Sequence, residues 1–501
     1  MATTARAAER PTPAAFARRP VLMVAGAAGL LLAVFSGRYG YHRDELYFRV
    51  AGRHPDWGYP DQPPLVPLLA RGITEVFGDS LVLLRLPSAL AVAAGVVVAA
   101  LTARELGGGR RAQLMTAGAF AVCPFFLAVG HLLSTATFDL LSSAVLVWLA
   151  VRWVRTRDQR LLLVIGAVAG LASNVKYLAG FLLGALVCGL LAVGPRDFLR
   201  RPMTYAGAAV AVAAMLPGLL WQARHGWPQL EMSERIAAEG DFGGRVGFLP
   251  FQLILTGVVL SWLWLYGLWR LFRSPELAPF RFLGCAYLLS CGVFLLTAGK
   301  PYYLAGLWPA LWAAGAVEVE RRSAPRGWAW AVSPPAYAIT AVVAAALTLP
   351  VYPVSVLADT PQPAINADAA ETVGWPRLVA EAARVHRSLP PAERARAVVF
   401  TVNYGQAGAL DRYGPRFGLP RPYSGHNGYW HFGRPPETGG PVIVVGGEAP
   451  LLRRHWSEVT MAGRVDNGVG LDNDEQGTPV WICRGQREPW AVLWPRLKHL
   501  D

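Results

Sequence analysis

Long apolar runs fill most of the chain up to about residue 350. A helix needs about 20 apolar residues to cross the hydrocarbon core of a bilayer. Backbone groups inside lipid must be hydrogen-bonded within the segment, so these runs are expected to be helices. The short alternating segments of a transmembrane barrel are absent from the sequence. We therefore predict a mainly α, polytopic membrane protein with about eleven spanning helices, at 21–37, 82–103, 113–130, 138–154, 161–174, 177–193, 203–222, 248–269, 282–298, 303–317 and 328–350.

The distribution of charged residues indicates that one part of the chain lies in the membrane and another part lies in water. Only 16% of the residues are charged, against about 25% in a soluble domain. They are sparse and clustered up to about residue 350 and ordinary after it. This pattern predicts a disordered cytoplasmic N-terminus (1–20), a membrane domain (21–350) and an extracytoplasmic α/β domain (351–501).

The net charge of +14 suggests nucleic-acid binding at first, but the basic residues lie between apolar runs and form no continuous patch. We therefore expect no nucleic-acid partner and a bilayer instead. The five cysteines include no CxxC pair, so neither a zinc site nor a disulfide framework is indicated.

Arginines between the runs predict the orientation. If the N-terminus is cytoplasmic, each segment on that side carries at least three arginines, and the opposite loops carry fewer for their length. Positive residues favour the cytoplasmic side of a cell membrane. An odd number of spans then places the C-terminal domain outside. The arginine-rich segments are 1–20, 104–112, 152–160, 194–202, 270–281 and 319–327.

The C-terminal domain shows both helical and strand patterns. Residues 378–389 have helical spacing and end at two prolines, whereas 397–402, 442–445 and 480–483 are short runs rich in β-branched residues. No GxGxxG motif follows a strand, so no dinucleotide site is indicated.

The first predicted outside loop contains two adjacent carboxylates, Asp44 and Glu45, directly after the first span. Ionisable groups near lipid are costly and often functional when they face a cavity. A carboxylate held there can act as a general base on an acceptor hydroxyl. The alternative is a solvated loop whose acids cap a helix.

Three more charged residues map to the same outer boundary. Asp139 lies at the start of the fourth run, and Lys176 and Lys300 lie at outer ends of runs in a chain rich in arginine. A compact ammonium can bind phosphate as a point charge. The alternatives are an N-terminal acid that favours the helix dipole and lysines that snorkel at helix ends.

These residues resemble the glycosyltransferase family 39 group, which includes protein O-mannosyltransferases and is related to the lipid A aminoarabinose transferases. The resemblance covers about residues 35–320. It is carried in order by Asp44-Glu45, Tyr59-Pro-Asp-Gln-Pro-Pro-Leu65, Phe77-Gly78, Arg85-Leu-Pro-Ser88, Asp139, Lys176-Tyr177 and Tyr302-Tyr303. The tail, with Asn403-Tyr-Gly-Gln406 and the 424–430 segment, is similar to actinobacterial members.

The resemblance implies a GT-C fold with its active site on the outer face and a polyprenyl-phosphate sugar as donor. It implies catalytic roles for Asp44, Glu45 and Asp139, and donor phosphate binding by Lys176. We expect Arg43 or Lys300 to assist Lys176 at the phosphate. The implied substrate pocket comprises His54, Tyr59, Asp61, Gln62, Pro63, Pro64, Tyr302 and Tyr303. Asp61-Gln62 replaces the Glu-Lys pair of the aminoarabinose transferases, so a metal site is unassigned and a divalent cation is an open expectation.

The predicted function is that of a plasma-membrane glycosyltransferase, mannosyltransferase-like, which moves a hexose or pentose with inversion to a protein, lipid or polysaccharide acceptor outside the cell. The alternative is a lipid or glycolipid transporter or flippase. A transporter should place ionisable groups and broken helices near the bilayer midplane, whereas here the charged residues gather at one boundary. A non-catalytic receptor is a third class, because the aromatic tail around 423–432 could contact glycans or form a folded core.

Overall fold

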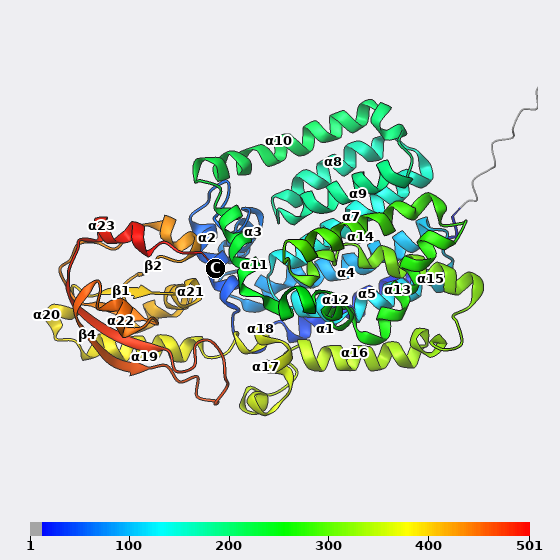
Figure 1. Ribbon diagram of the computed structural model, residues 1–501. Helices are drawn as coiled ribbons and strands as arrows, with labels where there is room; N and C mark the ends of the chain where they lie inside the picture. The colour runs from blue at the N-terminus through cyan, green and yellow to red at the C-terminus, as the bar shows by residue number, and fades with distance from the viewer. Residues whose placement is uncertain (1–12, 501) are drawn as a thin grey trace, which may run out of the picture.

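The computed structural model describes residues 13–500, which form an elongated molecule with a helical bundle at one end and a small sheet domain at the other (Figure 1). The predicted fold class, a mainly helical membrane bundle with a small C-terminal α/β part, is confirmed. Of the N-terminal stretch predicted to be disordered, residues 1–12 lie outside the described part, and helix α1 already begins at Arg18.

In the part of the chain that the structure describes, five helical segments are long and apolar enough to cross a membrane: α1 (Arg18–Phe35), α4 (Leu81–Glu105), α7 (Thr135–Thr156), α10 (Pro202–Arg224) and Ala278–Leu296, which contains α14 (Arg281–Leu296). Two bent pairs raise the number to seven: α5 (Arg110–Ala121) with α6 (Pro124–Gly130), and α12 (Gly244–Thr256) with α13 (Val258–Arg273). Three shorter apolar helices accompany them: α8 (Arg160–Ser173), α9 (Leu178–Val193) and α16 (Pro334–Thr348).

Two predicted runs are not straight helices. The run 113–130 bends by 56° where Pro124 starts a new helix, and the run 248–269 bends by 108° at Gly257. Proline cannot continue the hydrogen bonding of the preceding turn. Gly257 has φ of +81°, a conformation that glycine adopts at little cost. The spacing of apolar residues in the sequence does not predict either bend.

The loops of the bundle segregate into two sets. At one end, ion pairs join the arginine-rich segments, for example Arg155 with Glu105 and Arg270 with Glu318 (2.6 Å). At the other end, Leu65 N–H donates to the Asn174 carbonyl (3.1 Å). The sheet domain adjoins this second end, and α1 starts at the first (Figure 1). The arrangement agrees with the predicted orientation, although which end faces the cytoplasm stays a prediction.

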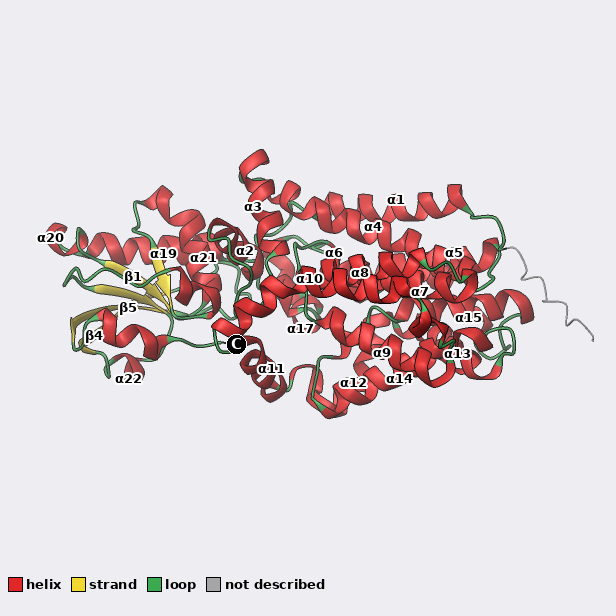
Figure 2. Cartoon of the chain, turned by 90° about the horizontal axis from the view of Figure 1, so that it is seen from above, coloured by secondary structure: helices red, strands yellow, loops and turns green. Residues whose placement is uncertain are grey.

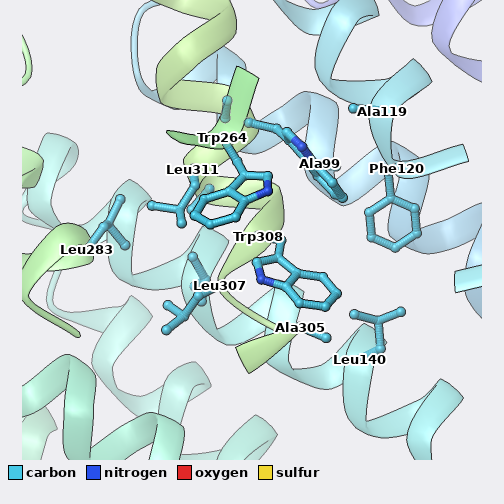
Figure 3. Close-up of a cluster of buried hydrophobic side chains, with 14 of the residues drawn as sticks. Ala99, Ala119, Phe120, Leu140, Trp264, Leu283, Ala305, Leu307, Trp308 and Leu311 are labelled. Atoms are coloured by element: carbon cyan, nitrogen blue, oxygen red, sulfur yellow. The ribbon is translucent and has the colours of Figure 1, made fainter. Parts of the chain in front are cut away.

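The bundle core is built around α15 (Trp308–Arg322), in which every residue from Trp308 to Val319 is buried. Trp308 and Trp264 lie among leucine and phenylalanine side chains from neighbouring helices (Figure 3). Helices α13 and α15 approach closely through Gly267 and Gly315, where a β-carbon would overlap the backbone of the facing helix. Small residues allow such close packing in membranes, where dispersion replaces hydrophobic driving force.

The predicted outside loops contain helices that the apolar runs did not reveal. The first loop contains α2 (Arg43–Arg53) and α3 (Leu65–Phe77), and a later loop contains α11 (Pro228–Glu239). Helix α2 begins with a capping box: Glu45 accepts from the His42 backbone N–H (2.8 Å), and the His42 ring accepts from the Asp44 N–H (3.3 Å). Caps of this kind satisfy the orphan donors of a first turn.

The C-terminal part is a five-stranded mixed sheet in the order β2-β1-β3-β5-β4. β1 is parallel to β2 and β3, and β5 is antiparallel to β3 and β4. The predicted strands correspond to β1, β3 and β5 and the predicted helix to α19, whereas β2 and β4 were not predicted. The bounds are β1 Val398–Thr401, β2 Pro422–Ser424, β3 Val442–Val445, β4 Trp456–Arg464, β5 Pro479–Gln486, α19 Trp375–Ser388 and α21 Tyr404–Tyr413.

Alternating strand residues pack on both faces of this sheet. Val399 and Ile443 face α19 and α21, in a cluster that also includes Leu46 of α2. Val398 and Val444 face the opposite cluster, which contains Trp490 of α23 (Trp490–Leu493). Figure 2 shows the sheet with its helices beside α2, at the junction with the bundle. The first cluster therefore joins the sheet domain to the bundle through α2.

One buried ion pair fixes α2 on the bundle. Glu45 is fully buried and Arg85 of α4 is 1% exposed. Arg85 donates twice to the Glu45 carboxylate (2.8 and 2.7 Å), which also accepts from the Leu133 N–H (2.8 Å). The remaining Arg85 donors reach the carbonyls of Ser36 (2.9 Å) and Gly40 (2.7 Å). The pair thus links the first loop, α4 and the α6–α7 junction.

Breaking this pair should strongly destabilise the protein. We expect Arg85→Met to lower the free energy of unfolding by about 3–5 kcal/mol, because it leaves a buried carboxylate without its partner. The control is Arg71→Met, which removes an exposed ion pair with Glu75 (2.7 Å) worth about 0.5 kcal/mol. Thermal unfolding of the detergent-purified variants measures both. Equal losses of stability in the two variants would contradict the role of Arg85.

Candidate active site

Asp44 lies at the junction of the bundle and the sheet domain. It occupies the first turn of α2, and its side chain is 39% exposed. The Tyr404 hydroxyl, at the start of α21, donates to its carboxylate (2.7 Å). Burial raises the pKa of Tyr404 well above its ordinary value, and the charge of Asp44 raises it further. Tyr404 therefore stays protonated and orients Asp44 as a hydrogen-bond donor.

Glu45 is placed differently from its neighbour. Burial would raise its pKa, but the bidentate Arg85 guanidinium and two backbone N–H groups hold it below the ordinary value. Its carboxylate is ionised, saturated with donors and closed to solvent. The geometry surrounds the Glu45 carboxylate with donors next to Asp44, and its predicted catalytic role stays a prediction.

A second carboxylate, Asp61, lies close enough to Asp44 for their charges to interact. Its partner is the Tyr47 hydroxyl, which donates to it (2.8 Å) and accepts from the Gly428 N–H of the sheet domain (3.1 Å). Burial raises the pKa of Asp61 to about 7, opposed by the Tyr47 hydrogen bond. Asp61 thus changes charge near neutral pH.

The predicted cations and the third acid complete one charged cluster. The charges of Asp139, Lys300 and Asp44 all act on the Lys176 ammonium, whose pKa burial lowers. Lys176 also lies over the rings of Tyr302 (5.3 Å) and Tyr303 (5.6 Å). Asp139 is 8% exposed, and its Oδ1 has no hydrogen-bond partner among the described residues. A buried acceptor of this kind is available to a bound hydroxyl.

An apolar groove leads to this cluster. A hollow of about 380 Å³ between α9 and α14 is lined mainly by apolar residues, with Gly180, Gly184 and Phe181 on α9 and Phe294 on α14. A smaller hollow shares Phe294 and extends to Tyr303. Tyr303 is one of the two tyrosines beneath Lys176. The two hollows share Phe294, and the smaller one places space beside a tyrosine that Lys176 covers.

The remaining predicted pocket residues shape the loop between α2 and α3. His54 stacks on Phe432 of the sheet domain (4.4 Å), and the Tyr59 hydroxyl donates to the Ala51 carbonyl (2.8 Å). Gln62 is 5% exposed, and its amide nitrogen has no partner among the described residues. Pro63 and Pro64 line a small hollow against the α8–α9 loop and α10. Of this group only Gln62 has a side-chain donor left for a substrate.

Arg43 lies apart from the lysines. Its guanidinium pairs with Asp474 (3.7 Å) and lies over the Tyr404 ring (5.9 Å). It joins α2 to the sheet domain, which makes it a weaker candidate for donor phosphate binding than Lys176.

In the sequence, the segments around Tyr404 and Gly428 stand out only as features of the tail. Their approach to Asp44 and Tyr47 depends on contacts more than 300 residues apart in sequence, which no local pattern reports.

Among the side chains that the structure describes, no three histidine, cysteine, aspartate or glutamate residues form a metal-ligand group. The divalent cation stays an untested expectation.

Part of the chain is similar in sequence to a known protein family. Residues 61–221 match the family described as dolichyl-phosphate-mannose-protein mannosyltransferase. The lipid A galacturonosyltransferase RgtD of Rhizobium johnstonii is 25% identical over 241 residues, 46% of this chain and 50% of the relative. The chain thus spans about half the length of that curated relative. The resemblance to the glycosyltransferase family 39 group is confirmed.

The fold is similar to that of ArnT from Cupriavidus metallidurans bound to undecaprenyl phosphate, with a TM-score of 0.61, 16% identity and coverage of 92% of this chain and 97% of that chain. The mycobacterial arabinofuranosyltransferase AftD gives a TM-score of 0.51 at 16% identity, covering 95% of this chain and 40% of that chain. These likenesses confirm the predicted GT-C fold.

The raised pKa of Asp61 predicts a pH dependence of stability. A carboxyl with a folded-state pKa near 7 and an unfolded value near 4 binds more protons when folded. Stability should therefore fall as pH rises from about 4 to 7. We expect Asp61→Asn to reduce this fall, as measured by thermal unfolding between pH 4.5 and 8. Identical pH profiles for the variant and the wild type would refute the raised pKa.

Proposed function

We propose that the chain is a membrane glycosyltransferase that moves one sugar from a polyprenyl-phosphate donor to an acceptor on the side of the sheet domain. The observation that carries the proposal is that the charge of Asp44, whose side chain is 39% exposed, acts on the buried Lys176 ammonium. An apolar hollow lies nearby between α9 and α14. A base, a phosphate-binding cation and a path for a lipid chain are the parts that this reaction needs.

Asp44 acts as the general base. Tyr404 donates to its Oδ1. Its Oδ2, 3.9 Å from Nδ1 of His42, can accept the proton of an incoming acceptor hydroxyl. The acceptor oxygen then forms a bond to the anomeric carbon while the bond from that carbon to the phosphate oxygen breaks. The sugar passes through an oxocarbenium-like state. A single displacement of this kind inverts the anomeric centre.

Lys176 stabilises the departing phosphate. The electron pair of the broken bond remains on the phosphate, which gains negative charge, and a preoriented cation in a water-poor site lowers the energy of that charge. Lys300 is close enough for its charge to act on Lys176 and is the second cation of this group. Asp139 keeps Lys176 protonated and offers its unpartnered oxygen to a sugar hydroxyl.

The polyprenyl chain lies in the groove between α9 and α14. The groove is open, apolar and about 380 Å³ in volume, which suits an isoprenoid segment that remains in contact with the bilayer. The acceptor approaches from the sheet domain, whose Tyr404 and Gly428 border the site. The acceptor is a hydroxyl of a protein, lipid or polysaccharide, and the sugar is a hexose or pentose.

Replacing Asp44 should abolish transfer. We expect Asp44→Asn to lower turnover by about 10²-fold or more, since a general base commonly contributes that much, with insertion and thermal stability retained. The measurement is transfer of label in proteoliposomes from radiolabelled polyprenyl-phosphate sugars to a membrane extract.

The matched control is Asp56→Asn, an exposed acid that follows α2 in the same loop. It should transfer at the wild-type rate. Wild-type turnover in Asp44→Asn would exclude the base. If wild type transfers no label but carries the lipid across the bilayer, the flippase alternative replaces the enzyme.

Filling the groove should weaken donor use. A β-carbon at Gly184 would meet no atom within 4 Å, so Gly184→Phe places its ring in the groove without a backbone clash. We expect a rise of about tenfold in KM for the polyprenyl donor and little change in kcat. Gly292→Phe on α14 is equally unhindered but does not line the groove, and it serves as the control. An equal KM effect in both variants would argue against the groove.

A further inference from the structure

A second hollow lies on the other side of α2, away from Asp44. It has a volume of about 340 Å³ and is enclosed by α2, by α21 and by the turn after α21. The two helices lie side by side in both views (Figures 1 and 2). They touch at Gly408, where a β-carbon would lie 2.8 Å from the β-carbon of Leu46. The hollow is therefore built by the contact between the bundle and the sheet domain.

Four arginines and two aspartates line this hollow. The arginines Arg49 and Arg53 come from α2, one turn apart, and Arg412 and Arg416 come from α21 and the following turn. Asp79 pairs with both Arg49 and Arg412 (3.2 Å to the latter), and Asp411 pairs with Arg53 (3.8 Å). Arg416 has no carboxylate within ion-pair distance among the side chains that the structure describes. Positive charge therefore exceeds negative charge in the hollow.

Several guanidinium donors are left over. Nε and Nη1 of Arg49 and Nε of Arg412 are buried and have no hydrogen-bond partner in the described part of the chain. Burial lowers the pKa of Arg49, and the charges of Arg412 and Arg53 lower it further. Asp79 and Asp411 supply only two negative charges to four guanidinium groups. The remaining positive charge and the unpaired buried donors are unfavourable unless a further anion joins them. Planar guanidinium groups match the oxygens of phosphate.

We infer that this hollow binds a phosphate group, separately from the site at Lys176. Arg49 and Arg412 form the floor and donate to the phosphate oxygens, and Arg53 and Arg416 close the rim. The group is either free phosphate or a phosphomonoester carried by a glycan. The inference does not depend on sugar transfer, because binding is a property of the folded hollow.

The test is calorimetric titration of the purified full-length protein at constant ionic strength set with chloride. Inorganic phosphate and glucose 1-phosphate are the two probes. The test variant is Arg53→Gln with Arg416→Gln, because both side chains lie on the exposed rim and their loss should leave the fold intact. The control is Arg453→Gln, an exposed arginine elsewhere in the sheet domain. A titration of Lys176→Gln separates this site from the donor site.

We expect saturable binding that persists in Lys176→Gln and Arg453→Gln and weakens at least tenfold in the rim variant. Binding of both probes would identify free phosphate as sufficient, and binding of glucose 1-phosphate alone would identify the glycan ester. The inference is overturned if neither probe binds saturably. It is also overturned if the rim variant binds as well as the wild type, or if binding is lost in Lys176→Gln alone.

Discussion

The ion pair between Glu45 and Arg85 is the interaction on which the candidate site depends. Two charges are costly to bury unless each is fully paired, and here every carboxylate oxygen and the flanking carbonyls are engaged. The pair fixes the first turn of α2 against α4 and the α6–α7 junction. Asp44, the preceding residue, is thereby held at the end of the bundle next to the sheet domain, where its charge and that of Asp139 act on Lys176.

Helix α2 also explains why the sheet domain matters to the site. One side of α2 presents Asp44 and Tyr47 to Tyr404 and Gly428. The other side presents Arg49 and Arg53 to α21. The sheet domain therefore completes two sites at once, and a shift of α21 along α2 would alter both.

The sequence predicted the bundle because apolar length is a direct consequence of bilayer thickness, and it predicted the charged boundary from Asp44, Asp139 and Lys176. The sequence did not predict the bend at Gly257, because a positive φ does not change the spacing of apolar residues. It did not predict helix α2 either, because a short polar helix has no apolar periodicity. It grouped Glu45 with Asp44 by adjacency, although successive helical residues point about 100° apart. Tyr404 could not be assigned, because its contact with Asp44 spans 360 positions.

The central claim is that a polyprenyl phosphate places its phosphate at Lys176, within reach of Asp44. A structure of the protein with a bound polyprenyl phosphate tests this most directly. We expect phosphate density between Lys176 and Lys300 and isoprenoid density along α9 and α14. Phosphate density elsewhere, in the arginine hollow between α2 and α21 or at the opposite end of the bundle, with the α9–α14 groove empty, would contradict it.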